Sequence, residues 1–193
     1  MVLDPRTPVL VGVGQVTERP DETKPVVERV EPVELMARAL RAAATDCAGA
    51  GGGDRLLARA GSLRIMVPLS WRYINPALLV ADRLGLAPTE LALTSIGGNS
   101  PQTVASATAQ AIASGDLDVA LLAGAECIYT RIAARRDPER PILPWTTEPP
   151  ETPEPVRIGV DDCPSATGPP MLTVSARPTR CAGQFWLGPG VPR

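Results

Sequence analysis

A glycine-containing turn near the middle of the chain has the residue types that stabilise negative charge. Residues 95–104 read SIGGNSPQTV and join an apolar stretch to an Ala-rich stretch. The two glycines allow a sharp turn and close approach of a ligand. Asn99 or Ser100 can cap the following helix, and Asn99 as the cap would put Gln102 in a capping box. The free amides of such a helix start suit an anion, an oxyanion or a thiolate, although an ordinary capped connection explains the same residues.

The other chemically reactive side chains do not form a catalytic or metal-binding pattern. The chain has no histidine, which excludes Ser-His-Asp and Cys-His catalysis within it. No two cysteines are spaced as C-x-x-C, so we expect neither a zinc site nor a thioredoxin-like motif. We expect no metal and no cofactor. Each of the first two cysteines lies in an apolar pattern typical of a core position. The four cysteines are Cys47, Cys127, Cys163 and Cys181.

Two glycines in the first apolar stretch raise the alternative of a dinucleotide site. Gly12 and Gly14 follow strand-like residues, but the third glycine of the fingerprint would fall at Thr17. The residues that follow do not begin a helix. We therefore favour close packing of this strand against a neighbouring element over nucleotide binding.

The elements that must position the turn alternate between strands and helices. Short apolar runs predict strands at residues 8–16, 63–67, 91–95 and 119–124. Helices are predicted at residues 33–48, 75–84 and 100–114, with a flexible glycine run at 49–53 ending the first of them. Alternation of this kind predicts an α/β fold with a mostly parallel central sheet. The helix at 100–114 has small side chains all round, so we expect it to be buried between layers.

The last third of the chain has a different character. Thirteen of the 22 prolines lie beyond residue 136, and proline disfavours regular helices and central strands. We therefore divide the chain into an α/β domain at residues 1–127, a Pro- and charge-rich loop region at 128–160 and an irregular tail at 161–193. Residues 161–193 show no helical or strand periodicity, and we expect them to be disordered or to come from another reading frame.

The stretch from the glycine turn through DVALLAGAE at 118–126 resembles the thiolase superfamily, as does VLVGVGQ at 9–15. The closest similarity is to acetyl-CoA acetyltransferases and sterol-carrier-protein-linked thiolase-like proteins, over roughly residues 8–160. The resemblance implies a layered half-fold, with the helix at 100–114 beginning at the nucleophile position. It also implies acyl-CoA as the ligand, and it implies that active members are dimers that pair through the strand at 91–95.

Two departures limit what the resemblance carries over. The family's nucleophilic cysteine falls on Gly97, which has no reactive group, and the family's histidines come from a second half. The resemblance therefore implies a truncated acyltransferase that is catalytically incompetent by itself; the alternative is a non-catalytic acyl-CoA-binding or partner-binding scaffold. The implied substrate contacts are Gly97, Gly98, Asn99 and Ser100. Arg131 and Arg135 are the implied contacts to coenzyme A phosphates, although a solvated charge run explains them too.

The composition indicates which kinds of partner the protein can bind. The net charge is −2 and only 3% of the residues are aromatic, which disfavours nucleic-acid binding. No segment approaches 18 uninterrupted apolar residues and the first residues do not resemble a secretion signal, so we expect a cytoplasmic protein with no membrane contact. A half-fold leaves a helix layer uncovered, which predicts an exposed apolar surface and a homo-oligomer or a partner subunit.

Overall fold

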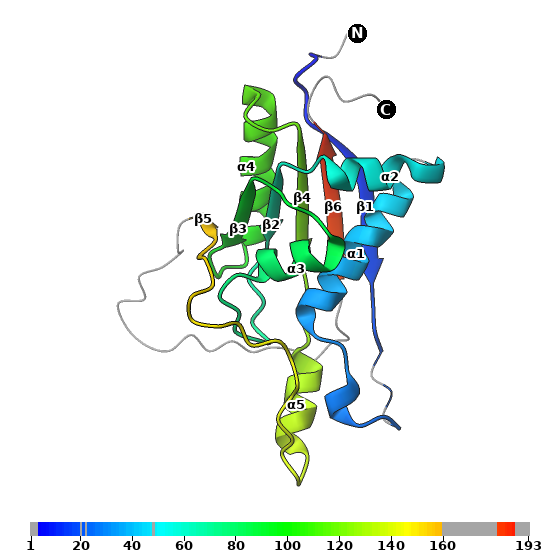
Figure 1. Cartoon of the computed structure of the whole chain (residues 1–193), viewed down its shortest axis with the longest axis vertical. Helices are drawn as coiled ribbons and strands as arrows, with labels where there is room; N and C mark the ends of the chain where they lie inside the picture. Colours follow the sequence, from blue (N-terminus) through cyan, green and yellow to red (C-terminus); the bar gives the residue numbers. More distant parts are fainter. Residues whose placement is uncertain (1–3, 20, 22, 48, 160–180, 188–193) are drawn as a thin grey trace.

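Six strands form one sheet in the order β1-β6-β4-β2-β3-β5 (Figure 1). The computed structural model describes residues 4–19, 21, 23–47, 49–159 and 181–187. Strands β2, β3, β4 and β5 run parallel to one another, and β6 is antiparallel to both of its neighbours, β1 and β4. The mostly parallel α/β architecture predicted from the sequence is confirmed. The strands are β1 (Val9–Val16), β2 (Ser62–Ile65), β3 (Glu90–Thr94), β4 (Val119–Gly124), β5 (Val156–Ile158) and β6 (Cys181–Leu187).

The main core lies between the sheet and one layer of helices. Figure 1 shows α1 (Pro32–Asp46), α2 (Gly49–Ala58) and α3 (Pro76–Leu84) on one face of the sheet. The apolar side of α1 is completely buried there, as are the side chains of β2 that face it. The start of α3 follows the sequence prediction, because the Asn75 side chain accepts a hydrogen bond from Leu78 N and Gly85 ends the helix with φ 67°.

The other face of the sheet carries, among the described helices, only α4 (Ser100–Ser114). Its buried residues are spaced four apart, and the small apolar cluster beneath it includes Ala120 and Leu122 of β4. The remaining positions of α4 are half-buried or exposed. The prediction that this helix is buried between layers is therefore wrong for this chain, because no second layer covers its outer flank among the described residues. The buried stripe of α4 is Ser100, Val104, Thr108 and Ile112.

The glycines of β1 allow α1 to lie directly on the strand. A Cβ atom at Gly12 would stand 2.4 Å from Ala43 O, and one at Gly14 would stand 2.2 Å from Ala39 O. Both contacts are with backbone atoms, so only glycine fits at either position. The close-packing interpretation of these glycines is confirmed.

The glycine run after α1 was predicted to be flexible, but it forms the first turns of α2. Gly53 explains how this helix can form despite the low helix propensity of glycine. A Cβ atom at Gly53 would stand 1.8 Å from Ala44 O, so the missing side chain lets α2 pack against α1. Tertiary packing outweighs local propensity here.

Two further elements were not predicted. Helix α5 (Ile128–Arg136) lies in the region expected to be a loop, and β6 lies in the tail expected to have no regular structure. The expectation of an irregular tail is therefore wrong for Cys181–Leu187, where main-chain pairing with β1 and β4 forms a strand. Residues 160–180 and 188–193, including Cys163, lie outside the described residues. The domain boundaries at 127 and 160 stay a prediction.

The Pro-rich residues 143–159, which we call the strap, follow an extended path across the ends of the strands to β5 (Figure 1). The carboxylate of Glu148 accepts hydrogen bonds from Ile74 N at 2.6 Å and Asn75 N at 2.7 Å. The Asn75 amide donates to Pro153 O at 2.9 Å. The Glu148 and Asn75 side chains thus tie the strap to the start of α3, although the strap lacks the internal hydrogen bonds of a helix.

Candidate functional site

The turn between β3 and α4 is closed by hydrogen bonds of its own residues. Ser100 Oγ donates to Ser95 O at 2.7 Å, and Ser100 N donates to Gly97 O at 3.1 Å. Asn99 is the N-cap residue, but its side chain makes no capping bond, and Gln102 Nε2 donates to Ser106 Oγ at 3.0 Å. The predicted capping box is therefore absent. The Ser100 hydroxyl is occupied in holding the turn.

Residues that flank this turn in the sequence line two cavities. The α4 cavity, of about 500 Å³, is bounded by Pro101 and Gln102 of α4, by Gly124 and by the Glu126 carboxylate. The tryptophan cavity, of about 670 Å³, has Ile96 at its edge. None of the four predicted contacts lines either cavity: Gly97, Gly98, Asn99 and Ser100. Trp71, Tyr73, Leu69, Leu93, Arg72, Arg131 and Arg157 are among the lining residues of the tryptophan cavity.

A third cavity, the arginine cavity, continues from the tryptophan cavity along α5. It measures about 560 Å³, and Trp71 and Arg131 line both. Arg135 and Arg140 add two guanidinium groups to its wall. The structure therefore brings the two predicted phosphate contacts, Arg131 and Arg135, to one cavity. The sequence analysis did not single out Arg72, Arg140 or Arg157, because these arginines come from separate segments with no shared motif.

The loop between β2 and α3 is held in place beside these cavities. Glu126 accepts hydrogen bonds from Leu69 N at 2.6 Å and Ser70 N at 2.9 Å. Arg131 Nη1 donates to Leu69 O at 3.1 Å, which fixes part of its guanidinium group. Trp71 packs edge-on against Trp145, with ring centroids 5.2 Å apart. Trp145 is 6% exposed and belongs to the core, whereas Trp71 reaches the cavities.

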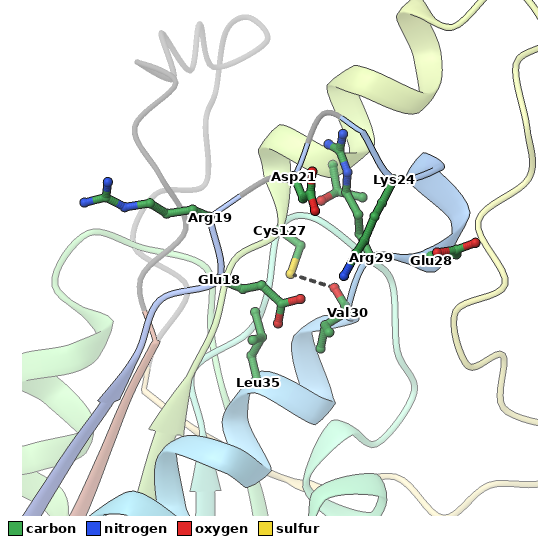
Figure 2. A pocket seen from close by; sticks show the side chains of 10 residues that line it. Glu18, Arg19, Asp21, Lys24, Glu28, Arg29, Val30, Leu35 and Cys127 are labelled. Carbon is green, nitrogen blue, oxygen red and sulfur yellow. Dashed lines mark hydrogen bonds between the residues drawn. The ribbon is translucent and has the colours of Figure 1, made fainter.

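The cysteines whose side chains are described do not lie at the turn. Burial and the neighbouring Asp46 carboxylate raise the pKa of Cys47, so its thiol is protonated at neutral pH. Cys127 is buried, and its Sγ lies 3.5 Å from Val30 O (Figure 2). Cys127 has the core position expected from the sequence, whereas Cys47 is half-buried and packs against the core. Among the described residues, no group of three His, Cys, Asp or Glu side chains is arranged to hold a metal ion.

Cys127 lines a smaller cavity of about 140 Å³, which charged side chains of both signs surround (Figure 2). Arg29 also lines it, and the guanidinium carbon of Arg29 lies 5.7 Å from the centre of the Tyr129 ring. Arg29 Nε and Nη1 are buried and have no hydrogen-bond partner among the described residues. Because these two atoms are shielded from solvent, a ligand in the cavity would not reach them.

We expect Arg29→Met to raise the free energy of unfolding by about 1 kcal/mol. Leaving buried N–H groups unpaired costs about 1–3 kcal/mol, which exceeds the contribution of one cation–π contact. Methionine keeps the apolar stem of the side chain. Urea denaturation would measure the change, with Arg38→Met as the control, since Arg38 has partners in Glu18 and Glu34. A loss of stability in Arg29→Met larger than that in Arg38→Met would contradict the prediction.

The proteins found to be similar to this chain are similar in structure. No protein-family model matches the sequence, and no curated protein matches it significantly. A monomeric SCP2-thiolase-like protein type 1 from Mycobacterium smegmatis superposes with a TM-score of 0.60 at 24% identity, over 98% of this chain and 48% of that one. The chain has a thiolase-like fold.

Two more distant structures share this thiolase fold. A variant of Xanthomonas campestris OleA, with bound lauric acid and lauroyl-CoA, has a TM-score of 0.57 at 12% identity. The 3-oxoacyl-(acyl carrier protein) synthase III, FabH, from Xanthomonas oryzae pv. oryzae has a TM-score of 0.55 at 13% identity. Each match covers 94% of this chain and 56% of the other. The thiolase-like chain therefore spans about half the length of the structures it matches.

The structure contradicts one expectation drawn from the thiolase resemblance. Strand β3 was expected to be free to pair with its mate in a second subunit. Instead, β5 pairs with β3 in parallel, with Ala92 opposite Val156 and Thr94 opposite Ile158. Both hydrogen-bonding edges of β3 are occupied within the chain, because β2 takes the other.

We expect Gly97→Cys to give a solvent-reactive thiol without creating an acyltransferase. The new Cβ would stand 2.6 Å from Asn99 Oδ1, the end of a side chain that can rotate, so the fold should tolerate it. The chain has no histidine to activate the thiol. Titration with Ellman's reagent should detect one additional fast thiol in the folded protein. Release of coenzyme A from acetyl-CoA should stay at the wild-type background; turnover above that of Gly98→Cys would contradict the prediction.

Proposed function

We propose that this chain is about half of a thiolase-like acyl-CoA acyltransferase and binds the thioester at the turn formed by Gly97, Gly98, Asn99 and Ser100. The observation that supports this most directly is that the residues flanking the turn, Ile96 on one side and Pro101 and Gln102 on the other, line cavities at the start of α4 in a thiolase-like fold. We place Gly97 at the nucleophile position. A glycine there, together with the absence of histidine, means that these residues alone do not transfer the acyl group.

The cavities have the chemistry that an acyl-CoA would need. A volume of 500–670 Å³ lies within the range of ordinary ligand pockets. Leu69 and Ile96 offer exposed apolar surface beside the turn, where an acyl or pantetheine group would lie. Arg131 and Arg135 line the far end, where guanidinium groups suit phosphates. The OleA variant, whose fold is similar, holds lauroyl-CoA.

The test is to measure binding and turnover separately. Calorimetry with acetyl-CoA and lauroyl-CoA should give a saturable signal at up to millimolar ligand, whereas an assay for coenzyme A release should remain at background. Absence of both heat and a thermal shift at millimolar ligand would rule out the binding proposal. Turnover by the chain alone would rule out the proposed incompetence, since no histidine or cysteine stands at the turn.

We expect Arg135→Gln to weaken binding of acetyl-CoA by about tenfold, because a charge-assisted hydrogen bond to phosphate contributes about 1.5–3 kcal/mol. S-acetyl-N-acetylcysteamine has the thioester without the phosphates, and its binding should not change. Arg136→Gln is the matched control, because Arg136 is exposed and is not among the lining residues of the arginine cavity. Equal effects of the two substitutions would show a general charge effect instead of a phosphate contact.

The second candidate is a non-catalytic acyl-CoA-binding or partner-binding protein. The engaged Ser100 hydroxyl favours it, because no nucleophile is then poised at the turn. Adding a chain that supplies the histidine-bearing half of a thiolase fold distinguishes the two proposals. Restored coenzyme A release would support the acyltransferase half. Binding of acyl-CoA with no release in any mixture would support the scaffold.

Exposed apolar side chains on one face of the sheet indicate a surface for a partner. The half-buried and exposed side of α4, with the exposed Leu10 and Val13 of β1, would be covered by a second copy or a partner subunit. Sedimentation at several concentrations would show whether the chain associates.

No helix in the part of the chain described here has the length and apolar character needed to cross a bilayer. We propose a cytoplasmic location, which fractionation of cells would test.

A further inference from the structure

The tryptophan cavity has an excess of positive charge. Its described lining residues include Arg72, Arg131 and Arg157, and none of them is an aspartate or a glutamate. The smaller cavity beside Cys127 is, by contrast, surrounded by charged side chains of both signs. A cavity lined by charge of one sign raises the local concentration of ions of the opposite sign. The tryptophan cavity therefore suits a ligand that carries negative charge as well as apolar groups.

The arginines of this cavity come from separate parts of the fold. Arg131 belongs to α5, and Arg157 belongs to β5, which lies apart from α5 at one edge of the sheet (Figure 1). Arg157 is opposite Leu93 in the parallel β3–β5 ladder, so the two side chains share one face of the sheet. Leu93 and Ile96, which begins the turn, also line the cavity. Arg157 is therefore the positive charge on the side of β3 and the turn.

Neither Arg157 nor Arg72 is firmly paired. Arg157 Nη2 lies 3.4 Å from the Glu154 carboxylate, and the two side chains are 60% and 72% exposed. An ion pair so open to solvent contributes little free energy, so another carboxylate can compete for the guanidinium group. Arg72 is exposed and forms no ion pair with any residue that the structure describes. Both groups are available to an anionic ligand.

We propose that Arg157, together with Arg72, binds a carboxylate at the far end of the acyl group, so that the chain prefers acyl-CoA thioesters whose acyl group ends in a carboxylate. This inference rests on the proposed function, in which Arg131 and Arg135 bind the phosphates of coenzyme A. That assignment leaves two guanidinium groups of the tryptophan cavity without an anion. A planar guanidinium group binds a carboxylate through two parallel hydrogen bonds, which an uncharged acyl end does not offer.

Glutaryl-CoA and pentanoyl-CoA test the carboxylate site, because their acyl chains are equally long and differ only in the terminal carboxylate. Calorimetry of the wild-type chain should show glutaryl-CoA binding about tenfold more tightly. Arg157→Gln should remove most of this preference and leave the affinity for pentanoyl-CoA unchanged, whereas Arg157→Lys should retain part of it. Arg136→Gln is the control, because Arg136 lines neither the tryptophan cavity nor the arginine cavity.

The readouts separate this site from the proposed function. Equal binding of both thioesters by the wild-type chain would overturn the carboxylate site and leave acyl-CoA binding in place. If neither thioester bound, the proposed function would fall and the site with it. Equal weakening of both thioesters by Arg157→Gln would show a contact to a coenzyme A phosphate, which also overturns the proposal. Arg72→Gln is the second variant, and a preference that survives both substitutions would place the carboxylate elsewhere.

Discussion

Gly14→Ala is expected to lower the free energy of unfolding by about 3 kcal/mol, near the upper end of the cost of overpacking a core. The added Cβ would stand 2.2 Å from Ala39 O and 2.5 Å from Ala43 N, both in the backbone of α1. Helix α1 contributes eight of the 26 buried residues of the main core, so it cannot move away without exposing buried apolar surface. Urea denaturation followed by circular dichroism would measure the loss.

Gly98→Ala is the matched control for this substitution. Gly98 is exposed and has no atom within 4 Å of its Cβ position, so the same change should stay within about 0.5 kcal/mol of wild type. Comparable stability of Gly14→Ala and Gly98→Ala would mean that α1 does not lie on β1 at the distance described. The same result would reopen the nucleotide-binding interpretation of Gly12 and Gly14.

Glu31→Ala is expected to lower the free energy of unfolding by about 3 kcal/mol, because it removes one member of a largely buried charged network. The Glu31 side chain is 14% exposed and forms an ion pair with Arg83. It also accepts hydrogen bonds from Thr146 N and Thr146 Oγ1, both at 2.9 Å, and from the Tyr73 hydroxyl at 3.1 Å. Without the carboxylate, the Arg83 guanidinium group loses its nearer carboxylate partner, and the Thr146 main-chain N–H loses its acceptor.

The substitution should also loosen the strap, because Thr146 belongs to it. Limited proteolysis of Glu31→Ala should cleave residues 143–159 faster than in wild type. Glu34→Ala is the control: its carboxylate is 32% exposed, lies 2.9 Å from Arg38 Nε and is only weakly paired with Arg83 Nε at 3.6 Å, so a cost below about 1 kcal/mol is expected. If the two alanine variants were equally stable, the Glu31 network would contribute no more than a surface ion pair.

Local patterns predicted the elements that surround the candidate site. The strands at β1 to β4 and the helices α1, α3 and α4 follow from apolar runs, helical periodicity and capping residues such as Asn75. The turn from Ser95 to Ser100 was located for the same reason, because glycines and a helix start are local signals. Its internal hydrogen bonds were not predicted, since Ser100 Oγ had several acceptors within reach along the sequence.

The sequence analysis missed the helices and strands that form only through contacts with residues far away in the sequence. Helix α2 begins in a glycine run and exists because Gly53 lets it approach Ala44. Strands β5 and β6 are defined by pairing with β3, β1 and β4, which lie far away in sequence. The cavities combine residues of the loop between β2 and α3, of β3, of α5 and of the strap, so no local spacing could indicate them.

The sequence by itself determined the α/β alternation, the glycine turn before α4 and the absence of histidine, because each depends on residue type and short-range spacing. Only the tertiary structure decided that α4 has one covered side and that β3 has no open edge. Whether a helix is covered, and whether a strand edge is paired, depends on which segments far away in the sequence pack against it. Backbone hydrogen bonding has no residue code that would reveal such partners in advance.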